Sequence, residues 1–169
     1  MRWRFEDGVF IISGVGDMRD FLYTNDPWED IKNEVQTITI QEGVTSIGNH
    51  AFCDMTSLLD ISIAGSVKRI GYGAFSDCNN LRSVVVPDGI KTIENSTFGG
   101  CESMISITIP RSVTHIEAFA FIACSNLEDV YYGGSKNEWE AVNIEWYEDG
   151  ALPVNNSLRG ATIHHSTPS

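Results

Sequence analysis

One short sequence recurs four times in this chain at a fixed interval. "IGNHAF" begins at Ile47, "IGYGAF" at Ile70, "IENSTF" at Ile93 and "IEAFAF" at Ile116. The steps from 47 to 70, from 70 to 93 and from 93 to 116 are each 23 residues long. A unit this short cannot bury its own apolar side chains, so the interval predicts a stack of repeats in which each unit covers its neighbours.

Each unit contains the same series of apolar positions. It opens with an apolar triplet, and the triplets begin at Ile38, Ile61, Val84, Ile107 and, in degenerate form, Val130. Apolar residues two positions apart predict a half-buried strand whose middle residue faces solvent. A bend rich in Gly or Pro, a V-x-x-I pattern and a Phe follow. Apolar residues at steps of three after the Phe predict a short helical turn.

Stacking in register predicts rows of like side chains. Phe52, Phe75, Phe98 and Phe121 are expected to form one row in the core. Cys78, Cys101 and Cys124 are expected to form a second row of buried free thiols, because unit one has the apolar Met55 in the same position. Cys53 lies outside this register, and we expect it to be partly exposed.

The stretch "IPRSVTHIEAFAFIACSNL", from Ile109 to Leu127, resembles the units of BspA-like leucine-rich repeats, and the resemblance extends from residue 38 to about 132. It implies an α/β repeat solenoid. The expected architecture is a right-handed leucine-rich-repeat superhelix with parallel strands, short helical turns, and N- and C-terminal caps. It further implies a role in adhesion and protein binding of the kind found in bacteria and some protists.

We expect a single domain over residues 1–169. Residues 1–34 form the N-terminal cap, residues 35–132 hold four full repeats and the start of a degenerate fifth, and residues 133–169 form the C-terminal cap and tail. All four tryptophans lie in the flanks, where large aromatic side chains can cover the open ends of the core. The Asp7-Gly8 pair predicts a hairpin, Asp26 and Pro27 predict the start of a short helix, "NEWEAVNI" predicts a helical turn, and "ATIHH" predicts a last strand.

Composition narrows the functional classes. The net charge of −12 argues against nucleic acid and anionic membranes as partners, and the apolar stretches are too short to insert into a membrane. The first residues lack the apolar segment of a signal peptide. We therefore expect either an intracellular protein or one whose leader was removed. The resemblance favours a secreted or cell-surface location.

Candidate catalytic and metal-binding residues are weak. His50 and Cys53 are three residues apart, but no acid is fixed by the repeat to orient the imidazole. His164 and His165 have no Cys or further His nearby in the sequence, so we expect them in a solvated tail. The sequence thus predicts a protein that is not an enzyme and has no cofactor or metal.

Two surfaces are candidates for partner binding. The first is the outward face of the strands, with the candidate residues Asp60, Ser83, Val85, Ser106, Thr108, Asp129 and Tyr131. The second is a basic stripe within the V-x-x-I segments, formed by Lys68, Arg69, Lys91 and His115, which suits an acidic protein or a glycan. The strand surface is equally compatible with a plain solvated sheet, and the basic stripe fits a solvated ridge somewhat better than a binding surface.

The function that these observations favour is a non-catalytic protein-binding module that acts in adhesion or in recognition of a host or other partner. The alternative is a small intracellular or injected acidic protein that binds and inhibits another protein. Seven acids against one base in residues 128–149 offer a second basis for the alternative, although such an excess also serves solubility.

Overall fold

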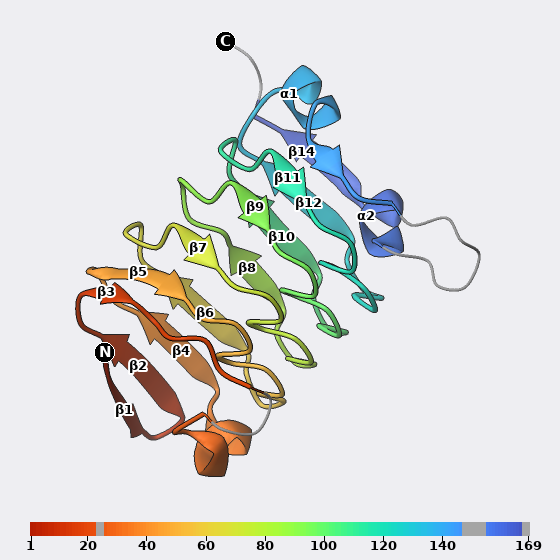
Figure 1. The fold of residues 1–169 in the computed structure, drawn as a ribbon. Coiled ribbons are helices and arrows are strands. Elements are labelled where there is room, and N and C mark those ends of the chain that lie inside the picture. Colours follow the sequence, from red (N-terminus) through yellow and green to blue (C-terminus); the bar gives the residue numbers. More distant parts are fainter. Residues whose placement is uncertain (23–25, 147–154, 167–169) are drawn as a thin grey trace.

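The computed structural model describes residues 1–22, 26–146 and 155–166, which form a stack of similar turns with a cap at each end (Figure 1). The strands are β1 (Arg2–Glu6), β2 (Val9–Ser13), β3 (Gly16–Asp17), β4 (Thr37–Ile40), β5 (Val44–Ile47), β6 (Asp60–Ile63), β7 (Arg69–Ile70), β8 (Ser83–Val85), β9 (Thr92–Ile93), β10 (Ser106–Ile109), β11 (His115–Ile116), β12 (Asp129–Tyr132), β13 (Asn143–Ile144) and β14 (Thr162–His165). The helices are the 3-10 helix η1 (Glu29–Glu34), α1 (Lys136–Glu140) and α2 (Asn156–Gly160).

The strands pair in the register that the 23-residue interval predicts. Ile38 lies beside Ile61, and Val84 lies beside Ile107, which in turn lies beside Val130. These pairs are parallel, whereas β1 and β2 form the antiparallel hairpin predicted at Asp7-Gly8. The chain is therefore a strand-rich stack of parallel sheets, as the repeat predicted.

The predicted row of phenylalanines runs through the core. Phe52, Phe75, Phe98 and Phe121 are fully buried, and successive rings stack with centroids 5.4, 5.9 and 5.7 Å apart. Trp28 extends the row, because its indole stacks on Phe52 at 5.6 Å. The N-terminal aromatic cap predicted from the sequence is thus confirmed for Trp28.

The thiol row is also confirmed, and the structure gives it a role in hydrogen bonding. All four cysteines are free and buried. Cys78, Cys101 and Cys124 each donate from Sγ to the carbonyl of a Phe in the preceding repeat, at 3.2, 3.3 and 3.0 Å. The expectation that Cys53 is partly exposed was wrong, because its exposed fraction is 0%.

The helical turns predicted after each Phe are not helices. Each repeat instead has a left-handed residue two positions before the Phe and another two positions after it. Around Phe52 these are His50 (φ 52°) and Asp54 (φ 60°), and around Phe98 they are Ser96 (φ 54°) and Gly100 (φ 74°). A left-handed residue ends a right-handed turn, so the spacing of three reflects tight hydrogen-bonded bends.

Both sheet rows are interrupted at the same repeat boundary. The first row divides into β1-β2-β4-β6 and β8-β10-β12-β14, and the second into β3-β5-β7 and β9-β11-β13. At this boundary Thr97 is fully buried where the other repeats have Ala, and its Oγ1 lies 3.5 Å from the Gly71 carbonyl. A narrow apolar void lined by Ile70, Ile93 and Phe98 lies beside it. Repeats two and three remain joined at this boundary by backbone hydrogen bonds, as from the Phe75 N–H to the Thr97 carbonyl at 2.9 Å and from the Asp77 N–H to the Gly99 carbonyl at 2.7 Å.

Each cap uses one side chain in place of the backbone of a missing repeat. Between repeats, backbone N–H groups of one unit donate to carbonyls of the next, as from Phe52 to Ala74 and from Phe98 to Ala120. The first carbonyl in this row, that of Ala51, accepts instead from the indole Nε1 of Trp28 at 2.8 Å. The last N–H, that of Phe121, donates to Oδ1 of the fully buried Asn155 at 3.0 Å.

The remaining cap predictions are corrected in detail. The helix predicted after Asp26 and Pro27 is the 3-10 helix η1, which begins two residues later at Glu29. Asp26 accepts from the Trp28 backbone N–H and pairs with the buried Lys32 at 2.9 Å, so it supports the turn before η1. "NEWEAVNI" contains α1 and β13, with Ser135 forming a capping box to Glu138. "ATIHH" is β14, as predicted.

Candidate functional site

The outward face of the β8-β10-β12-β14 sheet brings most of the predicted strand residues together. Two register rows lie side by side on this sheet. One row is Ser83, Ser106, Asp129 and Thr162, and the other is Val85, Thr108, Tyr131 and His164. The predicted Asp60 lies on β6, in the other half of the interrupted sheet. We call this two-row surface the strand face.

Large apolar side chains are exposed on the strand face. Val85 is 65% exposed and Tyr131 is 46% exposed. They lie two strands apart, with Thr108 between them, which corresponds to about 10 Å at the usual strand spacing. The neighbouring Ser and Thr side chains are small and do not shield Val85 and Tyr131, so both can contact a partner protein with a flat surface.

His164 completes the strand face, which the sequence did not predict. Its ring stacks on Tyr131 with centroids 4.7 Å apart, and its Nε2 lies 2.6 Å from an Asp129 carboxylate oxygen. His164 is solvent-exposed, as expected, but it lies in the predicted last strand "ATIHH" and not in a loose tail, because β14 pairs with β12 along its whole length. The 23-residue interval could not place His164 beside Tyr131, because β14 follows β12 at a spacing of 33 residues.

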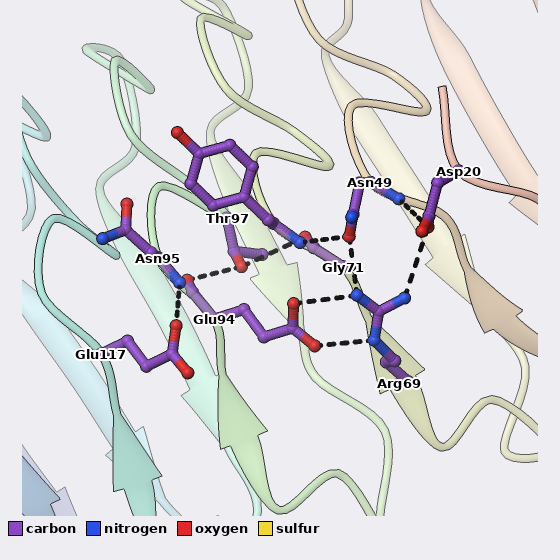
Figure 2. Close-up of polar contacts among 9 residues, drawn as sticks. Asp20, Asn49, Arg69, Gly71, Glu94, Asn95, Thr97 and Glu117 are labelled. Atoms are coloured by element: carbon purple, nitrogen blue, oxygen red, sulfur yellow. Dashed lines mark hydrogen bonds and ion pairs between the residues drawn. The ribbon is translucent and has the colours of Figure 1, made fainter. Parts of the chain in front are cut away.

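Three of the four residues of the predicted basic stripe are already paired with neighbouring groups. Arg69 makes a double hydrogen bond with the Glu94 carboxylate at 2.8 and 3.0 Å. It also donates to Asn49 Oδ1 at 2.6 Å and lies 3.5 Å from Asp20 (Figure 2). Arg69 therefore joins the N-terminal cap to repeats one, two and three, across the interruption in the sheets.

Lys68 and His115 are held by neighbours as well. The Lys68 ammonium donates to the carbonyls of Gly65 and Asp88 at 2.6 and 2.9 Å. His115 Nε2 lies 3.1 Å from a Glu145 carboxylate oxygen. Lys91 is exposed, and its ammonium makes no ion pair with the residues that the structure describes. The sequence analysis missed the acids that pair with the stripe. A signal was present, because Glu94 and Glu117 occupy equivalent positions, each directly after the last Ile of the V-x-x-I pattern.

The His50 and Cys53 pair lacks the character of an activated nucleophile. Burial raises the pKa of the Cys53 thiol to about 11, which keeps it protonated at neutral pH. Burial also lowers the pKa of His50, whose ring packs edge-on against Tyr72 at 4.8 Å. Across the described ranges, His, Cys, Asp and Glu side chains form no group of three or more that could hold a metal ion.

A membrane-spanning helix is not found in the part of the chain that the structure describes, since its helices lack the required length and apolar character. A comparison with curated protein sequences gave no significant match.

Solved structures of bacterial repeat proteins are similar to this chain. A leucine-rich cell surface protein of Faecalibacterium prausnitzii is 29% identical with a TM-score of 0.72, and the match covers 85% of this chain and 36% of that one. A leucine-rich repeat protein of Eubacterium ventriosum is 28% identical with a TM-score of 0.62, covering 79% of this chain and 41% of that one. The chain thus spans well under half the length of these two proteins.

A Treponema pallidum leucine-rich repeat protein shares the fold at 21% identity and a TM-score of 0.61, covering 77% of this chain and 67% of that one. The family model for the BspA type leucine-rich repeat region matches residues 31–142 with six copies. This match takes in every repeat recognised from the 23-residue interval. The chain belongs to the BspA-type leucine-rich repeat family.

Proposed function

We propose that this chain is a non-catalytic protein-binding module and that its partner docks on the strand face. Membership of a repeat family that generally mediates protein–protein interaction supports the first part. The exposure of Val85 and Tyr131 on one flat sheet is the observation that supports the second. Burying what is exposed of these two side chains would contribute about 2 kcal/mol to binding.

Adhesion or partner recognition at the cell surface is the role that fits this proposal. The Faecalibacterium prausnitzii relative is described as a cell surface protein, which supports this location. We extend the proposal to the architecture predicted above, a single domain over residues 1–169 whose repeats wind in a right-handed superhelix. A crystal structure would test the handedness directly.

A photo-crosslinking experiment tests the docking surface. Benzoylphenylalanine replaces Val85, and cross-linked partners from the native extracellular environment are identified by mass spectrometry. Each partner is then purified and its affinity measured. We expect Val85→Glu and Tyr131→Ala to weaken binding, and Lys91→Glu, on the other surface, to leave it unchanged. A partner whose affinity falls with Lys91→Glu and not with Val85→Glu would contradict the strand-face proposal.

A further inference from the structure

An apolar cavity opens at the N-terminal end of the stack. Its volume is about 260 Å³. Its apolar walls come from Trp3, Ile12, Met18, Phe21 and Trp28, and the charged side chains that line it are those of Arg2 and Arg19. The described residues that line the cavity include two arginines and no acid, although the chain as a whole carries a net charge of −12. Its electrostatics favour an occupant that carries negative charge.

The strand beside this cavity has a free edge. Among the strands that the structure describes, β1 is the outermost of its sheet and pairs with β2 alone (Figure 1). Its two-residue turn makes Glu6 and Val9 the first bonded pair, so Trp3 and Phe5 direct their backbone N–H and C=O groups away from β2. The edge therefore offers hydrogen bonds to one more strand.

The side chains of β1 divide by face. The Trp3 ring points inward, with centroids 5.6 Å from Phe10 and 6.4 Å from Trp28, yet the residue is 45% exposed. Arg2, Arg4 and Glu6 alternate with Trp3 and Phe5 on the strand and are exposed, so this set carries two positive charges against one negative charge. An added strand would place one set of alternate side chains over the cavity beside Trp3, and the other set beside the two arginines.

We propose that the free edge of β1 and the adjoining cavity bind an extended acidic segment of another protein, in which apolar and acidic residues alternate. The apolar side chains cover Trp3 and enter the cavity, and the carboxylates face Arg2 and Arg4. This second docking surface lies at the end of the stack, and it does not depend on the strand face.

The test uses the full chain with any tag at its C-terminus and a fluorescent probe peptide of sequence Glu-Val-Glu-Phe-Glu-Val-Glu, acetylated and amidated. Anisotropy measures its Kd, and hydrogen exchange reports on the Trp3 and Phe5 amides. We expect saturable binding that slows exchange at these amides. The double variant Arg2→Glu/Arg4→Glu should raise the Kd about tenfold or more, since it reverses two charges that face the peptide. Arg82→Glu, an exposed arginine far from β1, is the matched control and should leave the Kd unchanged.

Two control peptides separate this proposal from simple charge attraction. The same sequence with Lys for Glu, and the acidic sequence N-methylated at the residues that face β1, should both fail to bind. Equal binding of either control, or an equal loss with Arg82→Glu, would overturn the proposal. Concentration-dependent self-association that protects Trp3 and Phe5 without peptide would also overturn it, because the occupant would then be a second copy of the chain.

Discussion

Replacing Asn155 by Ala removes the side chain that ends the hydrogen-bond row at the C-terminal cap. The Asn155 amide makes three bonds: Oδ1 accepts from the Phe121 N–H at 3.0 Å, and Nδ2 donates to the carbonyls of Glu117 and Glu145 at 3.0 and 3.2 Å. Asn155 and Phe121 are both 0% exposed. Water therefore cannot replace the lost acceptor without opening the cap.

The cost follows from the groups that the variant leaves unpaired. A buried N–H without an acceptor costs about 1–3 kcal/mol, and each carbonyl that loses a donor adds about 0.5–1.5 kcal/mol or less where it keeps another partner. We therefore expect Asn155→Ala to lower the free energy of unfolding by about 2–4 kcal/mol. Since small domains are stable by about 5–15 kcal/mol, the change should be large on this scale.

Urea denaturation followed by circular dichroism measures this loss, and hydrogen exchange of the Phe121 amide locates it. Asn126→Ala is the matched control, because Asn126 also donates from Nδ2 to a carbonyl, that of Glu102 at 2.7 Å, but is exposed. We expect the control to cost less than about 1 kcal/mol. Equal losses for the two variants, or a protected Phe121 amide in Asn155→Ala, would refute the idea that Asn155 substitutes for a missing repeat.

Three further predictions follow from the core, the thiols and the ion pair. Phe98→Ala should lower the free energy of unfolding by about 3–5 kcal/mol in urea, because the ring is stacked on both faces, whereas Phe98→Leu should cost clearly less. Burial raises the pKa of Cys53 to about 11 and that of Cys124 to about 12, from 9.0. The contribution of these protonated thiols to the free energy of unfolding is therefore complete below about pH 9 and is lost as the pH rises above it. The free energy of unfolding should be lower at pH 10.5 than at pH 7.5, and Cys124→Ala should make this difference smaller. A double-mutant cycle with Arg69→Met and Glu94→Gln should give a coupling of only about 0.5–1 kcal/mol that falls in 1 M salt, because Arg69 is 43% exposed and solvent screens the pair; a coupling that salt leaves unchanged would contradict this account.

The sequence predicted what the repeat itself determines. An apolar residue that recurs every 23 positions must meet its equivalent in a stack, so the phenylalanine row, the thiol row and the strand register followed from the interval. The turns were mispredicted because apolar steps of three suit a bend and a helix equally. Gly73, Gly100 and Asp54 are residue types that favour left-handed backbone, whereas Ala123, in the position equivalent to Asp54 and Gly100, gives no such signal. Backbone conformation at such positions is set by the neighbouring repeats, which propensity does not report.

The sequence predicted which residues lie on the candidate surfaces, but not which groups pair with their charges. Which strand residues face outward follows from alternation, and Val85 and Tyr131 are exposed as expected. Alternation does not predict which groups pair with the Arg69 guanidinium. Its partners Asp20, Asn49 and Glu94 come from the cap and from two other repeats. Ion pairs between repeats depend on side-chain reach across the stack, and a residue's own unit contains no signal for them.

The two caps show that the ends of this fold are specified differently from its middle. Within the stack, backbone groups meet backbone groups, so any unit with the right apolar positions satisfies its neighbours. At the ends a single side chain must supply the missing group, and its chemistry is dictated by the direction of the row. At the N-terminal end the Ala51 carbonyl lacks a backbone donor, and the indole N–H of Trp28 donates to it. At the C-terminal end the Phe121 N–H lacks a backbone acceptor, and the side-chain oxygen Oδ1 of Asn155 accepts from it. Exchanging these chemistries would leave a donor facing a donor or an acceptor facing an acceptor, so we expect Trp28 and Asn155 to tolerate fewer substitutions than exposed positions of the repeats.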